Sequence, residues 1–139
     1  MTKFNYIYFK KDKKLRILNS KLNSKLTVVF LHGLKSDMEG KKPLFLNRYC
    51  KKNKVNFLSL EYAGHGKSYG KFENGTISQW RNNVKFVIRK IIKKEKADLS
   101  AVMVALDREE KDENNNFYRD NLNKEGIKIF SIAKISELT

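Results

Sequence analysis

The chain has 139 residues, of which 40% are hydrophobic and 12% aromatic, with a single cysteine and a formal net charge of +15. This length suits one domain with a real core, and the composition is that of a globular protein rather than a disordered one. We identify no apolar stretch long enough to span a membrane and no signal peptide. A single cysteine allows neither an internal disulfide nor a cysteine-based zinc cluster. We therefore expect a soluble cytoplasmic protein.

Elements of the first 94 residues are predicted from the period of their apolar residues. Continuous apolar runs of strand length predict buried parallel strands, and apolar residues every three or four positions predict helices. The longest helix places Ile77, Trp80 and Val84 on one face, with Thr76 or Ser78 near its N-cap. In chain order we expect a hairpin of strands 4–10 and 15–18 around a turn at 11–13, a strand at 26–31, a helix at 41–52, a strand at 55–62, a loop at 63–75 and a helix at 76–94.

The rest of the chain continues the alternation. We expect a strand at 100–106, a charged loop at 107–117, a weak helix at 118–125 with Gly126 as its C-cap, and a strand at 127–133. Strand–helix–strand order after an opening hairpin predicts an α/β fold. In detail, the prediction is a short three-layer sandwich with a mainly parallel sheet, preceded by an N-terminal β-hairpin, with residues 1–139 as one compact unit.

The positive charge is confined to the first part of the chain. Residues 1–96 hold 24 lysine or arginine and 6 aspartate or glutamate residues, whereas residues 97–139 hold 6 and 9. So abrupt a change of sign indicates two regions of different origin. The lysines are scattered rather than clustered, as an A/T-rich coding sequence would leave them, so we do not favour nucleic acid as the partner.

Two loops that follow predicted strands carry specific sequences. Phe30–Gly40 reads FLHGLKSDMEG, Tyr62–Ser68 reads YAGHGKS and Phe72–Trp80 reads FENGTISQW. In this order and spacing they resemble the N-terminal half of α/β-hydrolases, in the branch of small serine esterases and acyl-protein thioesterases. The resemblance covers about residues 4–92, is strongest over 28–80, and implies a small ester or thioester as the substrate.

The resemblance implies roles for residues in these loops. The backbone N–H of Leu34, which follows His32 and Gly33, would donate to an oxyanion, because a developing alkoxide needs a fixed donor on a rigid turn. Gly33 would let the backbone approach the substrate closely. Gly64–Gly66 would form a structural turn in which His65 is a turn residue rather than a base, and His32 has the similar alternative of orienting its own loop.

The catalytic residues of the family are not found where the resemblance places them. A nucleophile elbow should follow the strand at 100–106, but that strand runs into Asp107-Arg108, and we identify no Gly-x-Ser-x-Gly elbow in the chain. His32 and His65 both lie upstream of this point. A triad needs nucleophile, base and orienting group within hydrogen-bond reach. We therefore expect a truncated hydrolase-like protein that is inactive as it stands.

A different pattern occupies residues 92–139. The strand at 100–106 ends in Leu-Asp-Arg-x-Glu, and the chain closes with a second apolar strand at 127–133. These residues resemble the C-terminal tail of orotate phosphoribosyltransferase, and the resemblance implies that Arg108 contacts the carboxylate of orotate. The alternative is a strand-end arginine paired with Glu109 or Glu110. The Asp-Asp loop by which that family binds diphosphate is not found in the sequence.

Together the two resemblances and the change of charge suggest an in-frame chimera of parts 1–92 and 93–139, joined near residues 91–97. Two alternatives stay open: a fragment derived from an enzyme of pyrimidine nucleotide biosynthesis, and a basic, non-enzymatic binding module. We predict no metal and no cofactor. Cys50, on a lysine-rich helical stretch, is expected to be a half-buried structural thiol.

Overall fold

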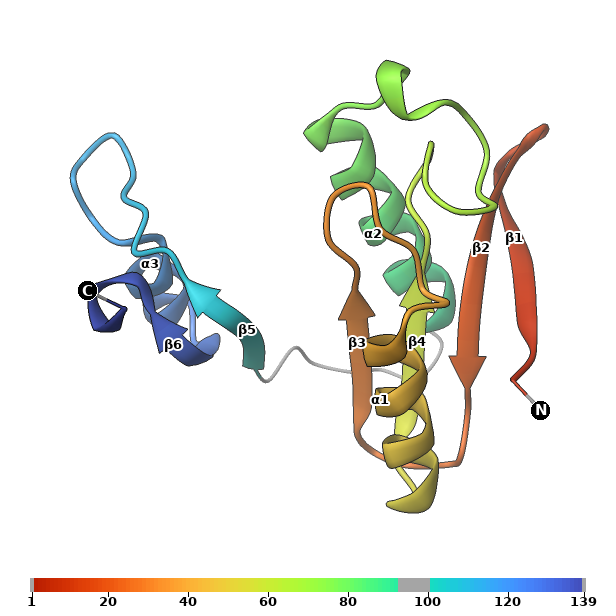
Figure 1. The fold of residues 1–139 in the computed structure, drawn as a ribbon, viewed down its shortest axis with the longest axis horizontal. Coiled ribbons are helices and arrows are strands. Elements are labelled where there is room, and N and C mark those ends of the chain that lie inside the picture. The colour runs from red at the N-terminus through yellow and green to blue at the C-terminus, as the bar shows by residue number, and fades with distance from the viewer. Residues whose placement is uncertain (1, 93–100, 139) are drawn as a thin grey trace. The chain divides into compact units, whose positions relative to one another are not determined.

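The computed structural model describes residues 2–92 and 101–138, and the chain divides into two compact units, Met1–Ala97 and Asp98–Thr139. The arrangement of residues 1–139 as one compact unit stays a prediction. The described elements of the first unit are β1 (Phe4–Lys10), β2 (Lys13–Ser20), β3 (Thr27–Leu31), α1 (Lys41–Lys52), β4 (Asn56–Leu60), a 3-10 turn (Phe72–Asn74) and α2 (Ile77–Ile91), shown in Figure 1.

The first unit contains a four-stranded sheet with the strand order β1-β2-β4-β3. β1 and β2 form the predicted antiparallel hairpin, β2 pairs antiparallel with β4, and β3 pairs parallel with β4. Because β3 and β4 run in the same direction, the loops that follow them, at 32–40 and 61–71, leave the sheet at the same end. The sheet thus brings together two loops that are about 30 residues apart in the sequence.

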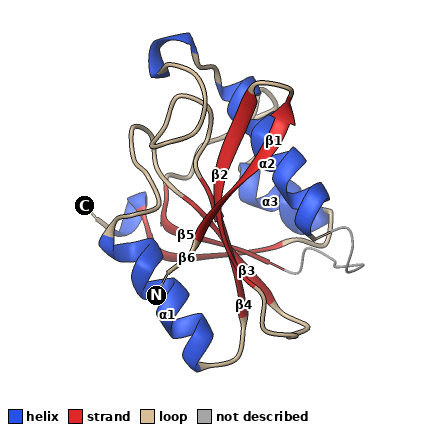
Figure 2. Cartoon of the chain, turned by 90° about the vertical axis from the view of Figure 1, so that its right-hand side faces the viewer, coloured by secondary structure: helices blue, strands red, loops and turns tan. Residues whose placement is uncertain are grey.

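Alternate residues of β4 face two separate cores. Leu58 and Leu60 pack with Val87 of α2, and Phe57 packs with Cys50 of α1. Every residue of β4 is buried, as expected of a strand covered on both faces. Figure 2 shows α1 and α2 on opposite sides of the strands. The predicted layered α/β architecture is therefore confirmed for this unit.

The second unit is a strand–helix–strand module. Its elements are β5 (Ala101–Asp107), α3 (Tyr118–Lys124), β6 (Lys128–Lys134) and a 3-10 turn (Ile135–Glu137). β5 and β6 pair in parallel, and α3 packs against β6. Gly126 has a φ of 83°, and the N–H of Ile127 donates to the carbonyl of Leu122 at 3.0 Å, which ends the helix where the sequence predicted.

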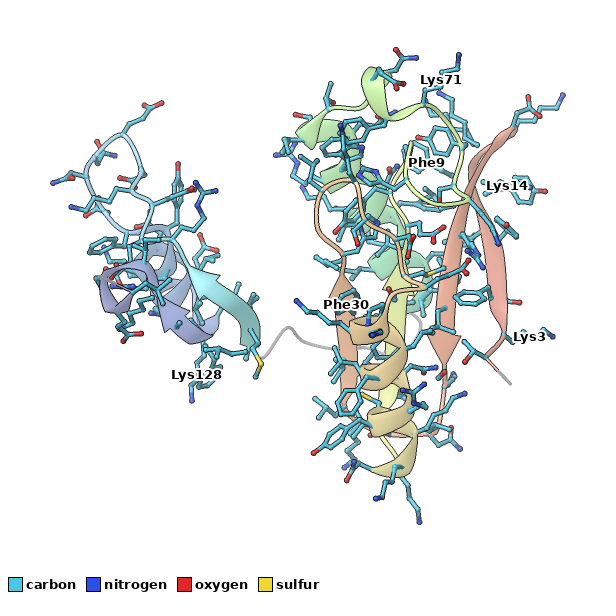
Figure 3. The ribbon with its side chains drawn as sticks, in the orientation of Figure 1. Lys3, Phe9, Lys14, Phe30, Lys71 and Lys128 are labelled. Carbon is cyan, nitrogen blue, oxygen red and sulfur yellow. The ribbon has the colours of Figure 1, made fainter. Side chains whose placement is uncertain are left out.

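The predicted element bounds agree with the structure to within about two residues. α1 has the predicted bounds, and α2 begins after Thr76, whose side chain accepts from the N–H of Gln79 at 3.1 Å. The predicted residues 93–94 and Ser100 lie outside the described residues. None of the helices within 2–92 and 101–138 is both long and apolar enough to cross a membrane. Lysines such as Lys3, Lys14 and Lys71 project from different parts of the first unit (Figure 3).

Candidate active site

The turn after β3 carries the predicted oxyanion donor, the backbone N–H of Leu34. The N–H of Ser36 donates to the carbonyl of Gly33 at 3.1 Å and closes the turn, with Lys35 at a φ of 55°. The side chain of Leu34 is 66% exposed, and no group in the described residues accepts from its N–H. A Cβ atom added to Gly33 would meet no atom within 4 Å. The space beside the Cα atom of Gly33, the residue before Leu34, is therefore open.

His32 is buried at the base of the turn, and both ring nitrogens have backbone partners. Nδ1 lies 2.8 Å from the carbonyl oxygen of Gly33, and Nε2 lies 3.4 Å from the backbone nitrogen of Tyr62. These partners assign the proton to Nδ1, so the lone pair of Nε2 accepts from Tyr62. Burial is the main cause that lowers the pKa of His32, which favours the neutral ring. His32 orients its own loop, and neither nitrogen is available as a general base.

Tyr62 links the loop after β4 back to the same histidine. Its hydroxyl donates to the carbonyl of His32 at 2.9 Å, and the two rings lie 4.1 Å apart between centroids. Burial raises the pKa of Tyr62 to about 12, so the hydroxyl stays protonated and keeps donating. The turn after β3 is thus held from the side of β4 by backbone and side-chain bonds together.

His65 joins the two loops directly. Its Nε2 accepts from the backbone N–H of Lys35 at 3.2 Å, and its Nδ1 lies 3.1 Å from the carbonyl of Ala63. The rings of Phe72 and Trp80 contact it edge-on, with centroids 5.3 and 5.1 Å away. The ring therefore fixes the residue that follows Leu34. Like His32, it has no free nitrogen with which to activate a nucleophile.

A buried carboxylate, which sequence reasoning missed, lies beneath both loops. Glu61 is fully buried and accepts from the backbone N–H of Lys67 at 2.8 Å, while its other oxygen lies 3.4 Å from Nη1 of Arg16. The same guanidinium also binds Glu39, and this bond is the main cause that lowers the pKa of Glu39. An acidic residue within the predicted strand at 55–62 was the signal available, because a buried charge needs a partner. Arg16, on β2, could not be found from spacing.

Gly64 and Gly66 have no room for a side chain. Gly64 has a φ of 73°, and a Cβ atom there would lie 2.7 Å from the backbone of Lys71. Gly66 has a φ of 50°, and its Cβ would lie 2.2 Å from the carboxyl carbon of Glu61. Both positions therefore require glycine, because the backbone conformation and the close approach each exclude larger residues.

The prediction that the chain lacks Gly-x-Ser-x-Gly is wrong, because Gly66–Gly70 reads Gly-Lys-Ser-Tyr-Gly. This stretch lies in a loop rather than at a strand-to-helix turn. The hydroxyl of Ser68 donates to the carbonyl of Glu61 at 2.6 Å and accepts from the N–H of Arg16 at 2.9 Å. A serine held in this way by two backbone groups ties β2 to β4. It has no histidine partner of the kind that a nucleophile requires.

β5, the strand after which the family resemblance places the nucleophile, does not end in a nucleophile elbow. β5 ends at Asp107, and the Arg108 that follows is exposed, with its Nε 3.3 Å from an oxygen of Glu110. This pairing is the strand-end alternative considered for Arg108. Within residues 2–92 and 101–138 no three His, Cys, Asp or Glu side chains are grouped so that they could hold a metal ion.

Cys50 is more deeply buried than the sequence predicted. It is 3% exposed and packs with Leu18, Met38 and Phe57 on the α1 side of the sheet. Burial raises the pKa of the thiol, which disfavours the nucleophilic thiolate. The geometry is that of a core residue.

The chain matches no protein-family model. Over 61 residues it is 33% identical to the mitochondrial palmitoyl-protein thioesterase ABHD10 of Bos taurus, a stretch that covers 44% of this chain and 20% of the relative. The matched stretch thus spans about a fifth of that curated relative's length. This similarity agrees with a hydrolase-like N-terminal half.

Solved structures show the same fold. A putative hydrolase from Agrobacterium vitis matches with a TM-score of 0.60 and 23% identity, over 78% of this chain and 40% of that one. An α/β serine hydrolase homologue from Coxiella burnetii matches with a TM-score of 0.52 and 14% identity, over 96% and 89%. At these identities the likeness establishes an α/β-hydrolase fold and nothing finer.

Proposed function

We propose that the first unit is the oxyanion side of a serine esterase or thioesterase site, and that the chain as it stands hydrolyses neither esters nor thioesters. The observation that carries this proposal is the turn Gly33–Ser36. The Leu34 N–H there has no acceptor among the described residues, and the space beside Gly33 is open. A fixed N–H beside open space can bind the carbonyl oxygen of a small ester or thioester. The bovine relative is named as a palmitoyl-protein thioesterase, which supports this substrate class.

Inactivity follows from the bonds that the candidate catalytic groups already make. His32 and His65 each use both ring nitrogens in holding loops, and the hydroxyl of Ser68 is held by two backbone groups. Without an activated nucleophile and its base, binding a carbonyl does not break the acyl bond. Both histidines precede α2, so the second unit supplies no other imidazole.

The test is the response of the Leu34 amide to a short thioester. In a ¹⁵N–¹H NMR titration with ethyl thioacetate we expect the Leu34 amide proton to shift downfield as it begins to donate to the carbonyl. Gly33→Ala should abolish the shift, because the new methyl group occupies the open space.

Gly40→Ala is the matched control, because it lies in the same loop, has a φ of −65° and would make only an ordinary contact at 3.9 Å. This variant should keep the shift. An unmoved Leu34 amide, or an equal loss in both variants, would contradict the proposed oxyanion site.

We also propose that the second unit has a separate origin, as the tail of a phosphoribosyltransferase joined in frame. Two positions that coincide support this: the net charge changes sign near residue 97, and the chain divides into its two units between Ala97 and Asp98. Single long sequencing reads should cross codons 91–97 without a break. Reads that end there would overturn the fusion.

The contact between Arg108 and orotate stays a prediction. If the NMR signal of the Arg108 side chain does not change when orotate is added, the prediction is refuted.

The proposed location is the cytoplasm. The bovine relative is named as a mitochondrial protein, and the mitochondrion is therefore the competing location. Fractionation of the source cells with antibodies to this chain distinguishes the two: signal in the cytosolic fraction supports the proposal, and signal in an organelle fraction contradicts it.

A further inference from the structure

The outward face of α1 exposes two aromatic rings. The helix buries Pro43, Asn47 and Cys50 against the sheet, while Phe45 and Tyr49 on the other side are 58% and 57% exposed. Their rings stack on each other, with centroids 6.4 Å apart and planes 24° apart. Large apolar side chains that lie side by side on the surface are typical of a site that binds a protein or a membrane.

The helix that carries this aromatic pair is rich in basic side chains. The helix contains no acidic residue, and its charged side chains are all basic and exposed: Lys41, Lys42, Arg48, Lys51 and Lys52. A hollow of about 590 Å³ beside it is lined by Glu39, Lys41, Lys42, Leu44, Phe45 and Arg48. Glu39 is bound by Arg16 and Lys67, so it does not neutralise the lysines of α1.

The other long helix of this unit shows that lysine-rich composition alone does not produce such a face. α2 also carries only basic charged residues, with Arg81, Lys85, Arg89 and Lys90 exposed. Its aromatic residues Trp80 and Phe86 are partly buried, and Phe86 packs against the core. Both helices are therefore basic, but only α1 of the two also exposes aromatic rings among its basic side chains.

We propose that this face of α1 binds an anionic phospholipid surface. Phe45 and Tyr49 would lie at the depth of the headgroups, where an apolar ring and a phenolic hydroxyl are both accommodated. The surrounding lysines and Arg48 would contact the lipid phosphates, each strengthening the binding by about fivefold. This inference is independent of the proposed hydrolase site, since it uses none of the residues of the turn after β3.

The stacking of the two rings favours lipid over single-stranded nucleic acid. A nucleic-acid strand needs separate aromatic platforms on which successive bases stack. Here Phe45 and Tyr49 lie side by side, with centroids 6.4 Å apart, and form one apolar projection, with the apolar side chain of Leu44 lining the hollow beside it. A single apolar projection on a basic helix face can insert between lipid headgroups while the basic side chains contact the phosphates. It offers no series of separate platforms on which successive bases could stack.

The test is sedimentation of the full chain with vesicles. We expect binding to vesicles of phosphatidylcholine with phosphatidylserine and little binding to phosphatidylcholine alone, with affinity that falls as salt rises. The pair Phe45→Ala and Tyr49→Ala should weaken binding about tenfold while leaving the circular dichroism spectrum unchanged, because both side chains are exposed.

A matched pair of charge variants separates α1 from general electrostatic attraction. Lys41→Gln with Arg48→Gln should weaken binding more than Lys85→Gln with Arg89→Gln, which removes the same charge from α2. Equal effects of the two pairs, equal binding to both vesicle types, or an unchanged affinity without the two rings would overturn the proposal. So would tighter binding to a single-stranded oligonucleotide that is lost with the same rings.

Discussion

The first unit buries side chains on both faces of its sheet, whereas in the second unit the side chains of residues 101–103 and 108–138 are all exposed or only partly buried. In the second unit α3 packs against β6, and the other face of the β5–β6 pair exposes Met103, Phe130 and Ile132. A strand pair with one bare apolar face is what a segment cut from a larger sheet would retain. In the first unit the apolar pattern of the sequence therefore matches the packing of both faces of the sheet.

The largest expected difference between the units concerns two glycines with positive φ. At Gly66 a Cβ would collide with the Glu61 carboxyl group, whereas at Gly126, with a φ of 83°, it would meet nothing within 4 Å. Gly66→Ala should therefore cost about 4 kcal/mol of unfolding free energy, from overpacking added to backbone strain. Gly126→Ala should cost only the strain, about 1 kcal/mol.

Urea unfolding followed by the fluorescence of Trp80 measures the first variant, and hydrogen exchange of the β5–β6 amides measures the second. Trp80 is the single tryptophan, so its signal reports the first unit alone. Similar losses for both glycines would contradict the crowding at Gly66.

Leucine and isoleucine truncations test the difference in burial more broadly. Leu60 is 0% exposed and Ile132 is 80% exposed. Leu60→Ala should cost about 3 kcal/mol because it opens a cavity between β4 and α2. Ile132→Ala should change stability by less than about 0.5 kcal/mol, measured by the same two methods. A cost at Ile132 that approaches the cost at Leu60 would mean that the bare face is covered.

A smaller difference should appear on mild acidification. Burial lowers the pKa of His32 from its ordinary 6.5, so below that pH the unfolded chain takes up a proton before the folded chain does. The stability that neutral His32 contributes is present above pH 6.5 and is lost as the pH falls below it, by no more than about 1.4 kcal/mol per pH unit. The second unit contains no histidine. The hydrogen exchange of the second unit, corrected for the intrinsic rate, should therefore not change over this pH range. An equal loss of stability in both units would show that His32 is not the cause.

Periodicity predicted the elements well, because each depends on neighbours in the sequence. α1 has the predicted bounds, and Thr76 caps α2 as one of the two candidates named. Strand order and buried pairings depend on residues far apart in the chain. Arg16 and Glu61 are 45 positions apart, and no local pattern connects them.

The site was predicted only as far as its local sequence. The position of Leu34 after His32-Gly33 indicated a donor on a turn, yet the bonds that hold this turn come from His65 and Tyr62, about 30 residues later. The Gly-x-Ser-x-Gly pattern at Gly66–Gly70 differs from a nucleophile elbow by its place in a loop, which the strand bounds define. Motif letters alone do not separate a structural serine from a catalytic one.

The central claim is that this chain keeps an oxyanion donor without an activated nucleophile. It is tested most directly by intact-mass spectrometry after incubation with excess fluorophosphonate probe, which modifies activated serines. The account predicts an unmodified mass, because Ser68 is held by Arg16 and Glu61 and neither histidine has a free nitrogen. A single stoichiometric adduct, at Ser68 or at any other serine, would contradict it.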